Sequence, residues 1–365
     1  MLTFLKLFKY YWKHLLNYKY VFRKRKILSS KIWGDQIFSD AINTSFNDYL
    51  SHSEKSNSRL KSLLIYDIID CYSMYGITPK EYFVLNFRNK GKEERASFLS
   101  IKNKDEMCLV KPNAWNVFQQ LENKSFFYSI TKKYFSRELI SINSIDDQCI
   151  FSEFYKKHNS FIIKSNFSHS GKGIKLIRDA SNENVTCSGL FNKLFSDNNK
   201  NGFIVEELIE QAKWMKEWNS SSVNTIRIPS IRNSKGYHIL NPFLRFGQPN
   251  CDIDNAGAGG AVILIDKDSG TLISNAHRQA GDVIKVKPET GELIKGLIVP
   301  KWKELLILTQ EIHKNLPEDY YYVGFDFALT EDKWVLIEGN WGAFLSWQQI
   351  MDKGCKEEFQ TLMEI

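Results

Sequence analysis

Two apolar runs separated by a short polar turn, within residues 323–340, predict a β-hairpin. Each run contains an acid, Asp326 in the first and Glu338 in the second, where a buried strand normally carries no charge. Buried carboxylates are costly unless a cation offsets their charge. The hairpin is therefore predicted to direct both acids into a cation site. The alternative is an ordinary hairpin whose acids point into water.

The third polar residue of this hairpin is Asn340, which follows Glu338 by two residues and so lies on the same face of its strand. Carboxylate and amide oxygens are ligands that hard divalent cations such as Mg²⁺ prefer. Asp326, Glu338 and Asn340 are thus predicted to bind Mg²⁺. The prediction depends on register, because a symmetric two- or four-residue turn would place Asp326 opposite Ile337. An odd-length loop or a β-bulge is needed to place it opposite Glu338.

The composition favours a globular protein of two or three subdomains. The chain has 365 residues, of which 43% are hydrophobic, enough for a sizeable core. Its six cysteines show no CxxC spacing and no accompanying histidine cluster, which argues against a zinc site or a disulfide framework and suits a reducing cytoplasm. No stretch has the length and apolar character of a membrane span.

The first 28 residues are basic and amphipathic. On a helical wheel, one face gathers lysines and an asparagine and the other gathers aromatic and aliphatic residues: Lys6, Lys9, Lys13 and Asn17 against Phe4, Phe8, Tyr11, Trp12 and Leu15. Such a helix can lie on an anionic bilayer, which predicts peripheral membrane contact through residues 1–28. The alternative is a surface helix packed on its own domain. The net charge is +7, but no nucleic-acid-binding motif accompanies it, so no nucleic-acid partner is expected.

The remaining pattern predicts a mostly helical first part, followed by strands and helices in the mixed order that is typical of an α+β enzyme. A polar stretch at 51–58 predicts a loop within the helical part. Short strands are predicted at 161–164, 175–177 and 203–205, and a helix is predicted at 302–314, just before the hairpin.

Three features in the middle of the chain could bind a nucleotide. Lys164 ends an apolar strand, where a buried ammonium needs an anion such as a phosphate. The loop at 168–173 is rich in Gly and Ser, so its N–H groups could approach a phosphate, and Lys172 adds charge, although the loop lacks the Walker A pattern. The strand at 203–205 leads into an acidic stretch at 206–210, which could contact adenine and ribose or could be a solvated turn.

The order of these features resembles the ATP-grasp superfamily. Further motifs are similar to those of its sugar-transfer-associated branch, and the similarity covers roughly residues 105–350. These motifs are Ser222-Val223-Asn224-Thr225-Ile226-Arg227-Ile228, Leu244-Arg245-Phe246-Gly247, Asp254-Asn255, Gly259-Gly260-Ala261 and Gly324-Phe325-Asp326-Phe327-Ala328. The resemblance implies an α+β ATP-grasp fold with a small lid subdomain, a larger mixed β-sheet subdomain and a mostly helical N-terminal region. The implied segments are the helical region at 1–104, an α/β segment at 105–160, the small subdomain at 161–215 and the large one at 216–365.

The resemblance also implies roles for individual residues, with the hairpin residues as Mg²⁺ ligands and ATP as the nucleotide. The implied ATP contacts are Lys124 and Lys164, the lid residues Ser170, Gly171, Lys172 and Gly173, the adenine hinge Glu206, Glu207 and Leu208, and Glu210 at the ribose. Many relatives have an acid where Asn123 precedes Lys124. Arg227 and Arg245 are implied to be catalytic, because a guanidinium fork can steady the transferred phosphoryl group; a salt bridge is the alternative for Arg227.

The implied activity is ATP- and Mg²⁺-dependent ligation of a carboxylate to an amine through an acyl-phosphate. Because this branch is found among genes for bacterial surface polysaccharides, the expected substrates are a sugar acid, as a small molecule or linked to a lipid, and an amine such as an amino acid. The implied location is the cytoplasm or the inner face of the cell membrane. Two alternatives stay open: a phosphotransferase of the same fold that acts on a hydroxyl, and a non-catalytic nucleotide-binding protein of polysaccharide assembly.

Overall fold

The computed structural model describes most of the chain, apart from both termini and several internal loops. The described residues are 35–167, 173–180, 186–197, 201–249, 251, 259–279, 281–342 and 345–364. The predicted amphipathic segment at 1–28 and three predicted lid residues, Ser170, Gly171 and Lys172, lie outside them. The chain forms two compact units, which we call the helical unit (Met1–Cys108 and Phe344–Ile365) and the sheet unit (Leu109–Ala343). The implied segment boundaries stay predictions.

The helical unit is largely helical, as predicted for the N-terminal region. Its elements are α3 (Asp35–Tyr49), α4 (His52–Ser56), α5 (Ser58–Tyr75), α6 (Pro79–Val84), the 3₁₀ helix η1 (Phe87–Asn89), α7 (Lys92–Ser97), α8 (Ile101–Leu109), α15 (Leu345–Met351) and α16 (Lys356–Met363). Among the helices in the described part of the chain, none is both long enough and apolar enough to cross a membrane.

The polar stretch at 51–58 is not the loop that its composition predicts. The Ser51 hydroxyl accepts from the Glu54 N–H at 3.3 Å, and the Glu54 carboxylate accepts from the Ser51 N–H at 2.9 Å. This capping box satisfies two N–H groups at the start of α4. The Asn57 side chain then caps α5 by accepting from the Leu60 N–H at 3.0 Å. The polar residues therefore form α4 and cap the starts of both α4 and α5.

A buried ion pair joins α5 to α7 in the helical unit. Both oxygens of Asp67, which is fully buried, accept from the Arg95 guanidinium, at 2.7 and 2.8 Å. The Tyr82 hydroxyl also donates to Asp67, at 2.5 Å. Further N–H groups of Arg95 donate to the Phe87 carbonyl at 2.7 and 3.1 Å. The carboxylate and the guanidinium are thus extensively hydrogen-bonded inside the core, as buried charges must be.

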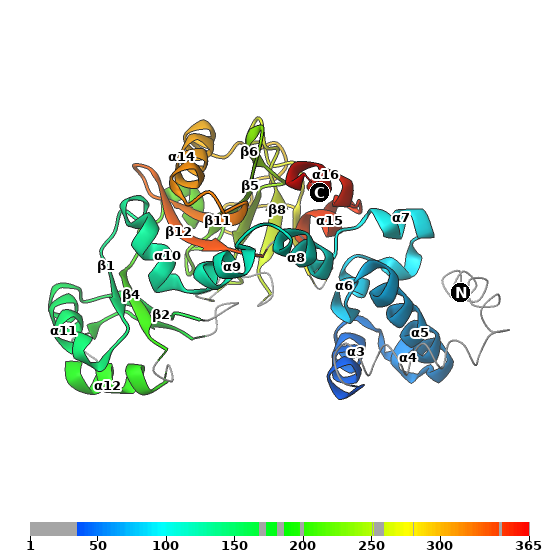
Figure 1. Cartoon of the computed structure of the whole chain (residues 1–365), viewed down its shortest axis with the longest axis horizontal. Coiled ribbons are helices and arrows are strands. Elements are labelled where there is room, and N and C mark those ends of the chain that lie inside the picture. The colour runs from blue at the N-terminus through cyan, green and yellow to red at the C-terminus, as the bar shows by residue number, and fades with distance from the viewer. Residues whose placement is uncertain are drawn as a thin grey trace. The chain divides into compact units, whose positions relative to one another are not determined.

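Within the described residues, the sheet unit contains two sheets (Figure 1). The smaller sheet has the order β1-β4-β2-β3, with strands β1 (Leu139–Ile142), β2 (Phe161–Ser165), β3 (Ile174–Ile177) and β4 (Phe203–Glu207). Helices α11 (Gln148–Lys157) and α12 (Cys187–Asp197) cover it and bury a shared aromatic core that includes Phe151, Phe154, Phe161, Phe191 and Phe203. The strands predicted at 161–164, 175–177 and 203–205 are confirmed.

The larger sheet has the order β10-β9-β8-β7-β5-β11-β12, and β6 pairs with β5. Its strands are β5 (Thr225–Asn233), β6 (Gly236–Ile239), β7 (Phe243–Phe246), β8 (Ala261–Leu264), β9 (Ala276–Arg278), β10 (Val283–Ile284), β11 (Tyr322–Leu329) and β12 (Trp334–Asn340). Every described pairing in both sheets is antiparallel, whereas the resemblance implied a mixed larger sheet. Strand β11 lies between β5 and β12 and is buried along its whole length.

The remaining helices of the sheet unit are α9 (Ala114–Glu122), α10 (Lys124–Thr131), η2 (Lys132–Tyr134), η3 (Ile145–Asp147), α13 (Lys213–Lys216) and α14 (Trp302–Asn315). Helix α14 confirms the helix predicted at 302–314. A buried histidine links it to β5: the His313 Nε2 donates to the Tyr320 carbonyl at 2.6 Å, and Nδ1 accepts from the Ser230 hydroxyl at 2.7 Å. Burial lowers the pKa of His313 to about 4, so the ring is neutral at pH 7.

The predicted hairpin is formed by β11 and β12, which are joined by a turn of four residues. Phe327 pairs with Leu336, so a regular ladder would place Asp326 opposite Ile337. A register shift between Asp326 and Phe327 instead places Asp326 opposite Glu338. The four-residue turn therefore needs a bulge to oppose the two acids, and the bulge is present, which confirms the prediction about register.

Helices α9 and α10 pack against β12, the strand that carries Glu338. The approach of α10 is close because Gly339 has no side chain: a Cβ at this position would lie 2.5 Å from the ring of Phe127. The Asn123 side chain caps α10. As a result Lys124, the first residue of the helix, is held beside the hairpin.

Candidate functional site

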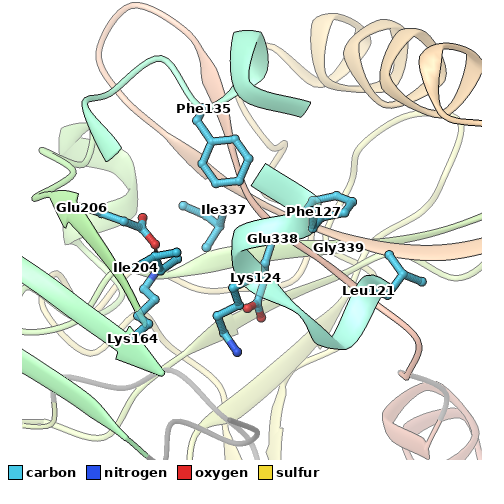
Figure 2. Close-up of a pocket in the computed structure, with 10 residues that line it drawn as sticks. All are labelled: Leu121, Lys124, Phe127, Phe135, Lys164, Ile204, Glu206, Ile337, Glu338 and Gly339. Carbon is cyan, nitrogen blue, oxygen red and sulfur yellow. The ribbon is translucent and has the colours of Figure 1, made fainter. Parts of the chain in front are cut away.

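A pocket lies between the smaller sheet and β12, where α9 and α10 also contribute to its wall (Figure 2). The empty space at this pocket, including its opening to solvent, is about 270 Å³. Its apolar lining is formed by Leu121, Phe127, Phe135, Ile204 and Ile337, and its charged lining by Lys124, Lys164, Glu206 and Glu338, with Gly339 between. The lining thus combines an apolar surface with two cations and two anions, so it can contact a ligand that has both apolar and charged parts.

Lys164, on β2, is held by a buried acid. Its Nζ lies 2.8 Å from Oε1 of Glu206 on β4, and the Glu206 side chain is 1% exposed. The other oxygen of Glu206 accepts from Arg137 Nε at 2.8 Å. Burial alone would raise the pKa of Glu206, but the charges of Arg137 and Lys164 outweigh burial and lower it. The carboxylate therefore stays ionised, with a cation at each oxygen.

Lys124 approaches the same pocket from the start of α10. Burial lowers the pKa of its ammonium, the negative charge of Glu338 counteracts that effect, and the positive charge of Lys164 adds to it. Figure 2 shows the Lys124 and Glu338 side chains close together, with Lys164 across the pocket. The predicted nucleotide lysines and one predicted metal ligand are thus brought to one space, although they come from three different elements.

Asp326, on β11 next to the edge strand β12, is fully buried and is held by two arginines. Arg227 binds both of its oxygens, donating from Nε to Oδ1 and from Nη2 to Oδ2 at 2.6 Å. Arg245 donates to Oδ2 at 2.8 Å. Asn340 Nδ2 lies 3.3 Å from Asp326 Oδ2 and 3.2 Å from Glu338 Oε1. Burial alone would raise the pKa of Asp326, but the two arginines lower it, so it is ionised.

The two arginines also bind their own surroundings. Arg227 donates to the Gly342 carbonyl at 2.9 Å, which fixes the chain just after Asn340. Arg245 donates to the Thr225 hydroxyl at 2.8 and 3.1 Å. Arg227 is 7% exposed, so its pairing with Asp326 is a buried ion pair and not the surface salt bridge that the sequence left as the alternative.

The donor set of this cluster fits Mg²⁺. In the described part of the chain no group of three or more His, Cys, Asp or Glu side chains is arranged to hold a metal, so a cation here would rely on two carboxylates and an amide. The Asn340 amide already bridges Asp326 and Glu338, and rotating it would present oxygen in place of nitrogen. Both oxygens of Asp326 are taken by arginines, whereas Glu338 is only half-buried, so Glu338 is the more available ligand.

Apart from Glu206, the predicted hinge and lid residues in the described part of the chain do not line the pocket. Glu207 is the last residue of β4 and accepts from the Glu138 N–H at 3.1 Å, and Leu208 follows it half-buried. The Glu210 side chain is 88% exposed and pairs with Lys216 at 3.4 Å. Gly173, the described lid residue, precedes β3 with a φ of 71°, which favours glycine. The roles of these four residues stay predictions.

The role of Arg137 and the apolar wall of the pocket, which is the apolar lining described above, were not predicted from the sequence. Arg137 lies just before β1, and its partner Glu206 is 69 residues away. Nothing in the local pattern indicates that partner, because the pairing arises only when β1 and β4 become neighbours. The one signal in the sequence is a charged residue immediately ahead of an apolar strand, which is common on protein surfaces.

Comparison with known proteins gives a family match and distant structural similarities. The sequence model of the family described as sugar-transfer associated ATP-grasp matches residues 108–363. A search of curated proteins finds no match.

Similar solved structures include D-alanyl-alanine synthetase A from Vibrio cholerae O1 biovar eltor, with 11% identity, a TM-score of 0.40 and coverage of 67% of this chain and 66% of that one. N5-carboxyaminoimidazole synthetase from Staphylococcus aureus complexed with ADP has 12% identity, a TM-score of 0.40 and coverage of 67% and 52%. Carboxyaminoimidazole ribonucleotide synthase from Aspergillus clavatus complexed with ATP has 9% identity, a TM-score of 0.38 and coverage of 63% and 46%. The chain thus spans about half to two thirds of the length of these proteins, and similarities this distant carry no functional conclusion.

Proposed function

The chain belongs to the sugar-transfer associated ATP-grasp family and has the ATP-grasp fold, and on this premise we propose that it is an ATP- and Mg²⁺-dependent ligase that joins a carboxylate to an amine. The observation that carries the proposal is the opposition of Asp326 and Glu338 across the bulge, with Asn340 bridging them. The proposed substrates are a sugar acid, free or lipid-linked, and an amine such as an amino acid, for bacterial surface polysaccharide synthesis. The proposed location is the cytoplasm, at the inner membrane face if residues 1–28 bind lipid.

In the proposed complex, the pocket binds ATP by its two kinds of lining. The adenine ring packs on the apolar wall, and the phosphates lie toward Lys124 and Lys164. The Glu206 side chain is buried against Lys164 and is not available to adenine. In the proposed complex, the backbone groups of Glu207 and Leu208 contact the adenine ring instead. The lid residues Ser170–Gly173 and the exposed Glu210 complete the proposed contacts to the phosphates and the ribose.

The hairpin forms the reactive end of the proposed site. Mg²⁺ held by Asp326, Glu338 and Asn340 would neutralise charge on the phosphates. Arg227 and Arg245 keep Asp326 ionised and place two guanidinium groups where they can steady a phosphoryl group in transfer.

The proposed chemistry proceeds in two steps. The substrate carboxylate displaces ADP from the γ-phosphorus and forms an acyl-phosphate. The amine then attacks the acyl carbon and loses a proton as phosphate leaves, which completes the amide. Alignment and charge neutralisation are the main requirements, so the proposal needs no covalent nucleophile on the protein.

The proposal is tested with Glu338→Gln, which removes the charge of the more available ligand and keeps its shape. Phosphate release with Mg·ATP is measured over pairs of sugar acids and amino acids, and products are identified by mass spectrometry. We expect turnover to fall by about 100-fold or more in this variant. Asp332→Asn, in the exposed turn of the same hairpin, is the matched control and should retain full turnover.

The products distinguish the alternatives. An amide formed with ADP and phosphate supports the ligase. A phosphorylated hydroxyl with no amide would identify a phosphotransferase of the same fold. Undiminished turnover in Glu338→Gln would remove the metal assignment.

A further inference from the structure

We propose that Arg137 is a positioning residue that fixes Glu206, and through it Lys164, for nucleotide binding. The same side chain also links these two residues to the hairpin of β11 and β12, which carries the proposed Mg²⁺ ligands. Arg137 does not line the pocket itself; it acts on a residue that does. The inference rests on the proposed function, because it takes Lys164 to be a lysine that binds phosphate.

The Arg137 side chain contacts both the smaller and the larger sheet. Arg137 Nε donates to Glu206 Oε2 on β4 at 2.8 Å, and Nη2 contacts the same oxygen. Its Nη1 donates to the Leu336 carbonyl on β12 at 2.8 Å and to the Phe135 carbonyl at 3.1 Å. Leu336 lies next to the bulge that opposes Asp326 to Glu338. One guanidinium thus connects β4, which pairs with the strand of Lys164, to β12, which carries the proposed metal ligands Glu338 and Asn340.

The fork of an arginine is needed for this arrangement. A carboxylate and two carbonyls lie in different directions, and the planar guanidinium reaches all of them at once, whereas a lysine ammonium is a compact point charge. The guanidinium also lies over the Phe135 ring, 4.7 Å from its centroid, and Phe135 is part of the apolar wall. The Arg137 side chain is 5% exposed, so its bonds are little weakened by water.

The charge count explains why Lys164 needs this support. Glu206 divides its two oxygens between Arg137 and Lys164, so the three groups together carry a net charge of about +1. Without Arg137, Glu206 would be neutralised by Lys164 alone, and a phosphate would then compete with a buried carboxylate for the lysine. Loss of Arg137 should therefore weaken nucleotide binding more than it slows turnover at saturating ATP.

Arg232 in the same unit provides a matched control. Its guanidinium also donates to backbone carbonyls, those of Leu316 at 3.1 Å and Pro317 at 2.7 Å, and lies over an aromatic ring, that of Tyr237. It is not part of the pocket lining. A purely structural arginine of this kind should affect folding stability without changing nucleotide affinity.

The experiment compares Arg137→Met, Arg137→Lys and Arg232→Met with the wild-type chain. Mg·ADP affinity is measured by titration calorimetry without an acceptor, together with thermal stability, KM for ATP and kcat. We expect Arg137→Met to weaken Mg·ADP binding about 10-fold or more and to raise KM similarly, with kcat within about 3-fold. Arg137→Lys, which keeps the charge and is the safer variant for folding, should recover part of the affinity. Arg232→Met should bind Mg·ADP as the wild type does.

A double-mutant cycle makes the inference specific. If Arg137 acts through Glu206, Arg137→Met should cost much less affinity in a Glu206→Gln background than in the wild type. Wild-type affinity in either Arg137 variant, or the same loss in both backgrounds, would overturn the inference. Failure of the proposed function is a separate result: Mg·ADP would then bind in an Arg137-dependent way, but no carboxylate and amine would be joined.

Discussion

Asp67 in the helical unit and Asp326 in the sheet unit are both fully buried carboxylates that bind an arginine through both oxygens. Around Asp67 the described network reaches the side chains of Tyr82 and Cys71 and the Phe87 carbonyl, and all three residues are fully buried. Around Asp326 the network continues through the Asn340 amide to Glu338, which is half-buried and lines a pocket. A buried aspartate–arginine pair therefore says little about function by itself. The continuation of its polar network to an accessible acid is what distinguishes a candidate site from a structural pair.

Removing the charge of each aspartate in turn tests whether the two ion pairs differ in function. Asp67→Asn leaves Arg95 buried without its counter-charge, so we expect the free energy of unfolding to fall by about 3–5 kcal/mol in urea titrations, with turnover per folded molecule retained. Asp326→Asn should destabilise the sheet unit comparably and should also abolish Mg·ATP turnover. Lost turnover in folded Asp67→Asn protein would contradict the distinction between the two pairs.

His313 differs from both aspartates, because it is a buried ionisable group that is kept neutral instead of being paired with a charge. Its folded pKa of about 4 lies below the ordinary value of 6.5, so the folded state binds fewer protons and its stability is lost as pH falls from 6.5 towards 4. Between pH 7 and pH 4.5 the loss from this group should be about 2–3 kcal/mol. Urea titrations of wild type and His313→Gln at both pH values measure it as the difference in their pH dependence. Equal pH dependence in the two proteins would contradict the neutral state.

The smallest expected effect is stabilisation by nucleotide. Mg·ADP at about 10 times its Kd should stabilise the wild type by about 1.4 kcal/mol, seen as a rise in Tm. Folded Asp67→Asn protein should show the same stabilisation, because the helical unit's ion pair is not part of the pocket. Asp326→Asn should show much less when Mg²⁺ is present, and chelation of Mg²⁺ should remove the difference between the two variants. Equal stabilisation of both variants by Mg·ADP would contradict the assignment of Asp326.

The sequence predicts the parts of this site that depend on local pattern. The hairpin follows from two apolar runs and a polar turn, and the need for a bulge follows from counting residues between Asp326 and Glu338. Lys164 is predicted because a buried ammonium at the end of an apolar strand needs an anion such as a phosphate. The strands around it and the helix at 302–314 follow from the same kind of local periodicity.

The parts that the sequence does not predict depend on contacts between distant segments. Arg137 meets Glu206 only because β1 pairs with β4, and the arginines meet Asp326 only because β5 lies between β7 and β11. The stretch at 51–58 was misjudged for a different reason. Its polar composition outweighed a Ser-x-x-Glu capping signal that is present in the sequence.

The bulge in β12 also shapes what the pocket can recognise. Along a regular strand, adjacent side chains point to opposite faces of the sheet. Only one of two adjacent residues can therefore face a cavity on one side. At this bulge Ile337 and Glu338, adjacent in the chain, both face the pocket. A hydrocarbon surface and a negative charge are thereby presented one residue apart, closer together than an unbroken strand permits. A ligand fitted to this wall must change from apolar to cation-bearing over a comparably short distance.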